Sequence, residues 1–458
     1  METKIDDLNA ILDSVADYQA FLSVDELRDS SRRLAAQHPD VVQILEAGTS
    51  RQGDTIEALK IGDGAKTALL FAMPHPNEPI GSMMLEALSA LLAENPSLRD
   101  TLDYTWYLIK CIDPDGTRLN EGWFKPPFSV TNYARHFYRP PSFEQVEWTF
   151  PIDYETLHFH DPLPETQALM RLIEERRPDF IYSLHNAGFG GAYFYMSEDA
   201  KALYEQLYIV IEDQDLPLHL GEPEMPFASA YAKAVYALPP IGQTYDFLKE
   251  QTGKDPAEIL SGGTSSLDYA QAFCDPFGLV CEVPYFYNAS IHDTSPSDMV
   301  RRDAILQGTA QAKAELQELQ EQYAAVEKEL TVPSPFRSAI EEALRTWPEH
   351  LTAQENWART DPKTERQATV AEKLDSLVIG RFYRLLSLGM YVRLLEVQIA
   401  ATGESPALAS ALAAATSLFE GNCSALEAEL DYSVIPIQKL VRVQLGSALL
   451  AAEYAARR

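Results

Sequence analysis

Cysteine is scarce in this chain, and long apolar runs are missing from it. The 458 residues include 4 cysteines at irregular positions, which argues against a disulfide scaffold or a cysteine-based metal cluster. No stretch of about 18 consecutive apolar residues occurs, so the sequence predicts no membrane-spanning helix. Residues 1–20 lack the basic start and the unbroken apolar stretch of a secretory signal. We therefore expect a cytoplasmic protein with reduced thiols.

Positive charge is also in short supply. There are 37 lysines and arginines against 68 aspartates and glutamates, and the formal net charge is −31. A field of that sign repels nucleic acids and anionic membranes. The sequence therefore predicts no nucleic-acid partner and no membrane partner, and we interpret the excess of acidic residues as a source of solubility.

The length and the hydrophobic content indicate a large globular enzyme. A chain of 458 residues, 46% of them hydrophobic, exceeds the size at which one core usually stops growing. Between about residues 20 and 320, apolar strands alternate with amphipathic helices, which predicts an α/β domain with a mixed, mostly parallel sheet flanked by helices. The turn at 48–54 predicts an antiparallel hairpin. The predicted strands are 41–46, 55–61, 67–73, 105–112, 180–184 and 278–283.

The last third of the chain has a different pattern. A long charged helix is predicted over 297–330, and the segment Pro333-Ser334-Pro335 that follows favours a boundary between a catalytic domain (1–330) and a second domain (331–458). Helical periodicity then continues almost to the end of the chain, which predicts an all-α C-terminal domain. Three roles remain open for it: packing on the enzyme, homo-oligomer formation, and shaping the substrate entrance.

Three side chains that can bind a metal follow two of the predicted strands. His75 and Glu78 lie three residues apart in a tight turn after strand 67–73, and His185 follows strand 180–184. Ligand sites in open α/β sheets form where strand ends converge on one crevice. Two histidines and one glutamate with an open fourth position are a known ligand set of catalytic zinc. We therefore predict one Zn²⁺ per chain, bound by His75, Glu78 and His185.

Glu282 is the predicted general base. It lies late in the apolar strand 278–283, where a buried carboxylate is costly unless it is paired or functional. Zinc lowers the pKa of a bound water toward about 7 and polarises a carbonyl, so a base is needed to take the proton. His158 and His160 alternate on one side of a possible strand. We interpret them as structural, because no carboxylate partner with a matching landmark accompanies them.

Further landmarks occur in a fixed order, and through them residues 20–300 resemble the zinc carboxypeptidases, metallopeptidase family 14. Glu282 follows Asp268 by 282 − 268 = 14 residues, which is the separation that this family has before its catalytic glutamate. The resemblance implies that His75, Glu78 and His185 bind zinc and that Glu282 acts as base and later as acid. The landmarks are Gly48-Thr49-Ser50-Arg51-Gln52-Gly53, His75-x-x-Glu78, Asp113-Pro114-Asp115-Gly116, Pro164-Glu165-Thr166, Ser183-Leu184-His185, Ser261-Gly262-Gly263-Thr264 and Asp268-Tyr269.

The resemblance also implies which residues contact the substrate. Arg118 is the candidate for the arginine that polarises the scissile carbonyl. Arg135 is the candidate for the arginine that grips the terminal carboxylate through a bidentate fork, and Arg139 is a nearby substitute. Leu267, beside Asp268, stands where the family reads the terminal side chain, and its apolar character favours an apolar terminal residue.

Two departures from the family pattern concern the substrate. Ala134 replaces an asparagine that helps to hold the carboxylate, and residues 254–261 contain no tyrosine, for which Tyr245 is an upstream substitute. The leading hypothesis is a zinc-dependent hydrolase that removes a C-terminal amino acid from a peptide or an amino-acid conjugate. Two alternatives remain open: an acyl-amino-acid amidase or deacylase on the same zinc site, and a zinc-binding scaffold that acts through its helical domain.

Overall fold

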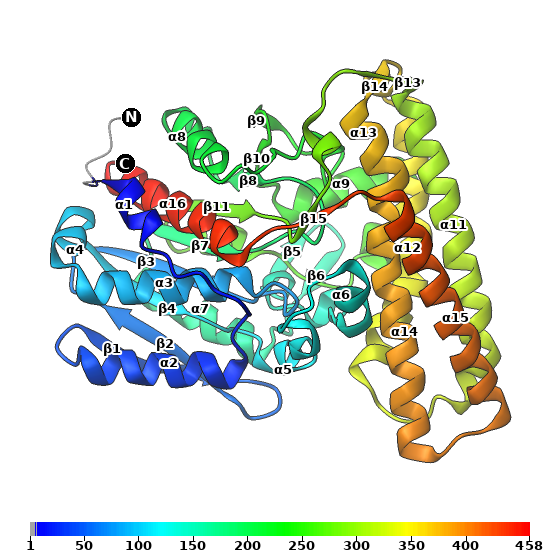
Figure 1. The fold of residues 1–458 in the computed structure, drawn as a ribbon, viewed down its shortest axis with the longest axis horizontal. Helices are drawn as coiled ribbons and strands as arrows, with labels where there is room; N and C mark the ends of the chain where they lie inside the picture. Colours follow the sequence, from blue (N-terminus) through cyan, green and yellow to red (C-terminus); the bar gives the residue numbers. More distant parts are fainter. Residues whose placement is uncertain (1–4, 6) are drawn as a thin grey trace.

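A nine-stranded mixed sheet forms the centre of the molecule in the computed structural model, which describes residue 5 and residues 7–458 (Figure 1). Four neighbouring strands, β4, β3, β7 and β11, run parallel to one another, while β2 and β8 flank them in the antiparallel direction. The predicted fold class and the predicted β1–β2 hairpin are confirmed. In spatial order the strands are β1 Val42–Thr49, β2 Thr55–Ile61, β4 Tyr104–Ile109, β3 Lys66–Ala72, β7 Phe180–Leu184, β11 Phe277–Glu282, β8 Tyr193–Met196, β10 Val235–Ala237 and β9 Ala230–Ala232.

Both faces of the sheet are buried, because successive side chains of a strand point to opposite sides. In β3, Leu69 and Phe71 belong to the core on one face, and Ala68, Leu70 and Ala72 belong to the core on the other. The first of these cores also holds α7 Pro164–Arg176 and α10 Ser266–Ala270. The second holds α3 Ile80–Glu94 and α16 Ile437–Ala456. Apolar residues at every position of such a strand are therefore a sign of helices on both sides.

The helix α3 packs unusually close to the sheet. A Cβ atom placed on Gly81 would come within 2.5 Å of the Leu184 side chain on β7, so this position requires glycine. The close contact joins the start of α3 to the end of β7, which is the edge of the sheet where the predicted ligands lie. Three further helices surround the sheet: α2 Val24–Gln37, α4 Pro96–Leu102 and α8 Lys201–Glu212.

Four long helices form a second layer beside the sheet, and we call them the helical layer (Figure 1). They are α11 Arg301–Val326, α12 Pro335–Thr360, α14 Gly380–Thr402 and α15 Pro406–Glu429. The helix α11 packs on α12, and α14 packs on α15. The boundary expected near residue 330 therefore falls inside this layer, between two helices that pack on each other.

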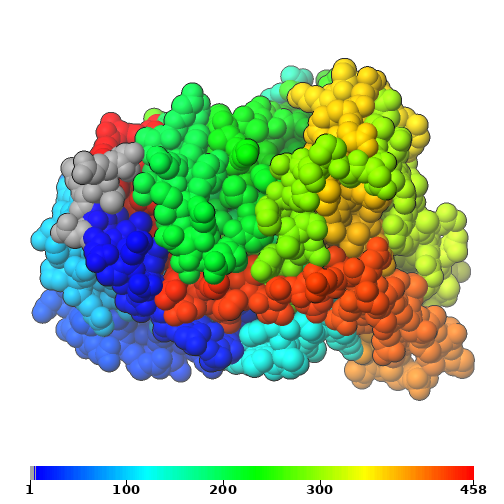
Figure 2. All heavy atoms as spheres, turned by 45° about the horizontal axis from the view of Figure 1, so that its top comes forward, coloured from blue at the N-terminus to red at the C-terminus, as the bar shows by residue number. Residues whose placement is uncertain are grey.

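The last helix leaves the helical layer and returns to the sheet. The chain after α15 crosses one face of the molecule, seen as the orange to red band in Figure 2, and α16 then packs on α3, α8 and β11. Its residues Leu440, Val441 and Leu449 are completely buried. Residues 331–458 thus contribute to two layers, and the helix that closes the core of the sheet comes from the C-terminal segment.

One long apolar run lies in the helical part of the chain. The run Val370–Thr402, which contains α13 Val370–Leu374 and α14, is apolar and long enough to cross a membrane, but 61% of its most apolar window is buried inside the molecule. Such burial is typical of a core helix in a globular protein.

The remaining elements near the site are short. They are α5 Pro114–Arg118, α6 Val130–His136, α9 Ile241–Thr252 and the hairpin of β5 Ile152–Tyr154 with β6 Leu157–Phe159.

Candidate metal centre and catalytic pocket

The loop after β3 is shaped by a residue in the left-handed region. Met73 has φ 56° and is completely buried, which is an uncommon backbone conformation for a residue with a side chain. It turns the chain sharply at the end of β3 and directs the following loop across the sheet edge. The turn at 113–116 packs against this loop, since a Cβ on Gly116 would lie 2.8 Å from Cγ of Pro76. His75 and Glu78 are therefore held by a tightly packed segment.

His75, Glu78 and His185 meet at the carboxyl ends of β3 and β7, which are neighbours in the sheet. Their exposed fractions are 4%, 3% and 5%. Nδ1 of His185 lies 3.0 Å from Nδ1 of His75 and 3.0 Å from Oε2 of Glu78, and Nδ1 of His75 lies 3.1 Å from Oε1 of Glu78. The structure therefore brings together all three of the predicted metal-binding side chains.

The spacing of these donors suits a zinc ion. Zinc binds nitrogen and oxygen ligands at about 2.0–2.2 Å in tetrahedral geometry, which separates neighbouring ligand atoms by about 3.3 Å. The observed separations of 3.0 to 3.2 Å are close to that value. Two imidazole nitrogens and a carboxylate facing one another at this distance, almost free of solvent, form a donor set of the type that catalytic zinc uses. The residues present therefore fit the ion.

A carboxylate orients His185 through a serine. Oγ of Ser183 lies 2.8 Å from Nε2 of His185 and donates a hydrogen bond of 2.9 Å to Glu147. Glu147 is buried and also accepts hydrogen bonds from the backbone and the hydroxyl of Ser266. Metal-binding histidines usually donate their second nitrogen to such a partner, which fixes the tautomer and the ring orientation. The sequence analysis missed Glu147, although Ser183 in the Ser183-Leu184-His185 motif was the available signal.

The C-terminal helix fastens the two strand ends that carry the site. The side-chain amide of Gln444 on α16 donates to the carbonyl of His185 at 2.7 Å and to the carbonyl of Cys281 at 3.2 Å. Gln444 is completely buried. It holds β7 and β11 together immediately beside the ligand and the predicted base. Sequence reasoning missed this contact as well, because the periodicity of α16 does not reveal what the helix packs against.

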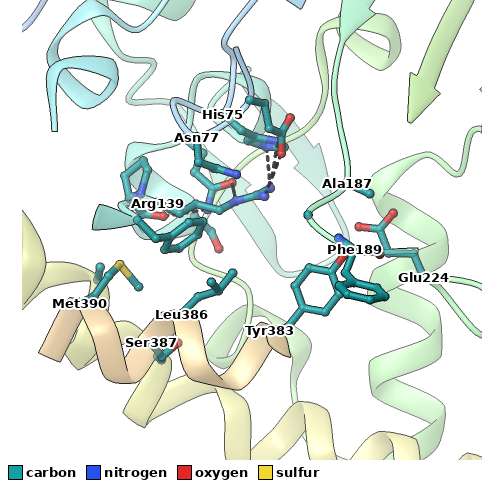
Figure 3. A pocket seen from close by; sticks show the side chains of 18 of the residues that line it. His75, Asn77, Arg139, Ala187, Phe189, Glu224, Tyr383, Leu386, Ser387 and Met390 are labelled. Atoms are coloured by element: carbon teal, nitrogen blue, oxygen red, sulfur yellow. Dashed lines mark hydrogen bonds and ion pairs between the residues drawn. The ribbon is translucent and has the colours of Figure 1, made fainter. Parts of the chain in front are cut away.

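A cavity of about 580 Å³ opens in front of the metal-binding side chains. Its size is in the range of small-molecule and peptide-terminus sites, about 300–1,000 Å³. One wall comes from the loops at the ends of β3, β7 and β11, and the opposite wall comes from α12 and α14 (Figure 3). The two walls touch, since the Tyr383 hydroxyl donates to the carbonyl of Phe189 at 3.2 Å. The helical-layer residues that line the cavity are Ala339, Glu342, Ala343, Thr346, Trp347, His350, Tyr383, Leu386, Ser387 and Met390.

Glu282 lines the same cavity at the end of β11, next to β7 in the sheet. Desolvation raises the pKa of its carboxyl well above the ordinary value, and the negative charge of Glu78 raises it further. Desolvation also lowers the pKa of His75 to about 3, with a further contribution from Arg139. For His185, burial would lower the pKa, but the hydrogen bond to Glu78 and the negative charges of Glu78, Glu282 and Glu147 together outweigh burial and raise it to about 9. Strongly shifted pKa values in one cavity are typical of a catalytic site.

Of the predicted catalytic arginine Arg118 and the predicted substrate-binding arginines Arg135 and Arg139, the structure brings only Arg139 to the cavity. Its guanidinium donates to Glu78 at 3.1 Å and lies 2.9 Å from ring nitrogens of His75 (Figure 3). Arg118 instead pairs with Asp25 at 2.8 Å and with Asp54 at 3.1 Å on the surface. Arg135 pairs with Glu396 of the helical layer at 2.5 Å. Among the described residues that line the cavity, Arg139 is the only arginine or lysine.

Leu267 and Asp268, at the place expected to read the terminal side chain, and Tyr245, the substitute for the missing tyrosine, also lie outside the lining of the cavity. Leu267 is buried between α10 and the sheet, where it packs on Gly278. The Asp268 side chain accepts a hydrogen bond from Thr264. Tyr245 contacts the Thr156 hydroxyl at 2.7 Å, on the side of α9 that faces the β5–β6 hairpin. The structure places these side chains in packing contacts and hydrogen bonds outside the lining of the cavity.

A second group of possible metal donors lies on the β5–β6 hairpin. Asp153 is paired directly with His158 across the hairpin, at 2.7 Å, and its carboxylate also contacts His160 at 3.0 Å. The sequence shows no carboxylate partner with a matching landmark for these histidines, and in the structure Asp153 contacts both of them. All three side chains are well exposed, unlike the buried group at His75, Glu78 and His185.

Comparison with known proteins agrees with the site. The sequence model of the family named zinc carboxypeptidase matches residues 27–284, which is more than half of the chain. No curated protein sequence matches the chain. Among solved structures, the chain is similar to the carboxypeptidase A of Helicoverpa armigera, at 14% identity over 77% of this chain and 79% of that chain, with a TM-score of 0.38. It is also similar to a metallo-carboxypeptidase of Burkholderia cenocepacia, at 15% identity over 57% of this chain and 60% of that chain, with a TM-score of 0.35.

The family match and the arrangement of the donor side chains point to the same assignment. The match ends at residue 284, so it includes His75, Glu78, His185 and Glu282. Members of this family use zinc, and the candidate zinc site of this chain is the buried group of those two histidines and Glu78. The chain therefore belongs to the zinc carboxypeptidase family, and it is a metallocarboxypeptidase.

Proposed function

We propose that this protein removes a C-terminal amino acid from a peptide or an amino-acid conjugate, with His75, Glu78 and His185 as zinc ligands and Glu282 as general base. The observation that carries the proposal is the position of Glu282, which lines the same cavity as the three donors and comes from the neighbouring strand. A carboxylate with a raised pKa beside a metal-binding group suits proton transfer near neutral pH.

The chemistry can be divided between the ion and the protein. Zinc, when bound, supplies a Lewis acid that makes a water more acidic and polarises the scissile carbonyl. Glu282 takes the proton of the attacking water and delivers it to the nitrogen of the leaving amino acid. Ser183 and Glu147 keep Nε2 of His185 protonated, so that its Nδ1 faces the other donors. Gln444 holds the ends of β7 and β11 in register, which keeps Glu282 beside the ligands.

Arg139 is the residue that we propose for the negative charge of the substrate. A free C-terminal carboxylate requires a cationic partner, and the guanidinium fork fits a carboxylate in a bidentate manner. Arg118 and Arg135 are engaged by acidic side chains away from the cavity. Arg139 is about one-third exposed and reaches the metal-binding side chains, so it can meet a carboxylate next to the scissile bond.

The experiment is hydrolysis of a panel of N-blocked dipeptides before and after removal of the metal by a chelator. We expect release of the C-terminal amino acid, loss of that release on chelation, and recovery when zinc is added back. Release that continues at the same rate after complete metal removal would contradict the proposal.

A second candidate is an acyl-amino-acid amidase or deacylase on the same site. It is favoured because two of the groups expected to bind the terminal carboxylate of the substrate are not available: Ala134 replaces the expected asparagine, and Arg135 pairs with Glu396. The two activities differ in the acyl group that they accept. If N-acyl amino acids with a fatty or short acyl chain are cleaved while N-blocked dipeptides are not, the second candidate replaces the first.

A further inference from the structure

The wall of the cavity opposite Arg139 carries an unpaired carboxylate. Glu224 lies on the loop between α8 and β9 and lines the cavity, and Figure 3 shows it across the cavity from Arg139. Its contacts are the hydroxyls of Tyr193 at 3.4 Å and Tyr195 at 3.3 Å. These are long for hydrogen bonds from a hydroxyl, whose usual length is about 2.7–2.8 Å. Within the described part of the chain, no lysine or arginine pairs with Glu224, so most of its hydrogen-bonding capacity is available.

The other acidic side chains on this side of the cavity already have partners. Glu222 pairs with Arg301, whose Nε donates at 2.8 Å. Asp375 accepts from the backbone N–H of Glu222 at 2.8 Å and lies 3.6 Å from Nε2 of His219. Glu224 therefore differs from its neighbours, because nothing in the fold neutralises it.

Two tyrosine side chains contact this exposed carboxylate. Tyr193 and Tyr195 lie edge to face, with ring centroids 5.8 Å apart. Burial raises the pKa of both Tyr193 and Tyr195 well above the ordinary value, and the charge of Glu224 raises it further, so both phenols stay neutral and point hydrogens at the carboxylate. A carboxylate beside aromatic rings favours the binding of an organic cation, through charge-assisted hydrogen bonds and cation–π contacts.

The charge of the cavity favours the same ligand. Six carboxylate residues line it, namely Glu78, Glu222, Glu224, Glu282, Glu342 and Asp375, and the single arginine is Arg139; Glu222 is already paired with Arg301, and the pKa of Glu282 is raised. The whole chain carries a formal charge of −31, so the field outside also attracts cations. A substrate with one carboxylate for Arg139 and a positive group for Glu224 would match both ends of the cavity.

We propose that Glu224, with Tyr193, binds an ammonium or guanidinium group on the acyl side of the scissile bond. The substrate class is then a peptide or amino-acid conjugate that is cationic on the side opposite the released residue. The orientation of the substrate in the cavity follows from two residues. Arg139 holds the carboxylate of the leaving residue, and Glu282 on β11 lies opposite Tyr193 on the neighbouring strand β8. The metal-binding group and Glu282 then lie between the two charged ends. This inference rests on the proposed function.

The test compares two N-acetylated dipeptides that share a C-terminal phenylalanine and differ at the first residue, lysine or norleucine. The two side chains have nearly the same length, so the comparison isolates the charge. We expect kcat/KM to be a few-fold higher for the lysyl substrate, up to about fivefold, because the Glu224 side chain is exposed and charge pairs of exposed side chains are weakened by solvent. In Glu224→Gln the ratio should fall to near one. In Glu212→Gln, which removes the same charge from the exposed end of α8 outside the cavity, the ratio should stay high.

Two results would overturn the inference: equal kcat/KM for the two substrates in the unaltered protein, or an unchanged lysine preference in Glu224→Gln. Calorimetric binding of the same peptides to zinc-loaded Glu282→Gln separates this inference from the proposed function. Tighter binding of the lysyl peptide that depends on Glu224, without hydrolysis by the unaltered protein, would keep the cation site and reject the hydrolysis. Hydrolysis with equal kcat/KM for the two peptides would keep the proposed hydrolysis and reject the cation site.

Discussion

The two walls of the cavity differ in what they contribute. The wall at the strand ends carries His75, Glu78, His185 and Glu282, on loops that are fixed by buried hydrogen bonds and tight glycine contacts. The helical wall carries apolar, hydroxyl and aromatic side chains from α12 and α14, together with Glu342 and His350. The difference indicates that the strand-end wall performs the chemistry, whereas the helical wall limits which substrate reaches it. The following predictions test that division.

Glu282→Gln should have the largest effect. Because a positioned general base contributes about 10²–10⁴-fold, kcat should fall by that factor while the zinc content stays at one per chain. Glu212→Gln on α8 is the matched control, since it removes a carboxylate outside the cavity. The readout is steady-state hydrolysis alongside metal analysis. If Glu282→Gln retained kcat, the assignment of the base would be wrong.

Arg139→Ala should lower kcat/KM by about 10–100-fold, mainly through KM, because a hydrogen bond to a charged group is lost. Arg135→Ala is the informative comparison. Its guanidinium pairs with Glu396 at the surface of the helical layer, and such exposed pairs are worth at most about 1 kcal/mol, or about fivefold. A larger loss in Arg135→Ala than in Arg139→Ala would reverse our assignment of the carboxylate-binding arginine.

Ser183→Ala should weaken zinc binding by about tenfold, since partners of metal-binding histidines commonly contribute 10–100-fold to metal affinity. The substitution removes the hydroxyl that connects His185 to Glu147, and it leaves all three metal-binding side chains in place. Competition with a chromogenic chelator measures the affinity. At saturating zinc, kcat should recover to within a few-fold of the starting value, which a misfolded variant would not achieve.

Leu386→Val on α14 should have the smallest effect. One buried methylene is worth about 0.8 kcal/mol, so KM should change by no more than about fourfold, with kcat nearly constant. The change should differ between substrates with small and large terminal side chains. A loss of kcat comparable to that of Glu282→Gln would show that the helical wall takes part in the chemistry, and the proposed division between the walls would fail.

The strand-end wall was largely predictable from the sequence. The predicted strands 55–61 and 180–184 agree with β2 and β7 at both ends, because the first alternates apolar and polar residues, the second is an apolar run, and both are bounded by turn residues. The meeting of His75, Glu78 and His185 followed from the rule that parallel strand ends converge on one crevice. In this fold β3, β7 and β11 are direct neighbours, which places Glu282 at the same edge.

The remaining parts of the site depend on contacts between distant segments, and no local pattern reveals these. Arg118 was chosen for its place after a family motif, but Asp25 lies 93 residues away in the sequence and pairs with it. The periodicity of α16 predicted a helix without showing that it returns to the sheet and that Gln444 fastens two strand ends. Glu147 lies outside the regular strands, so only the folded chain shows that it faces Ser183.

Zinc content per chain is the measurement that tests the central claim most directly. It should be measured after dialysis on the unaltered protein, on His185→Gln and on His158→Gln, which alters the exposed group on the β5–β6 hairpin. We predict one zinc per chain in the unaltered protein and in His158→Gln, and almost none in His185→Gln. Zinc retained by His185→Gln and lost from His158→Gln would contradict the account.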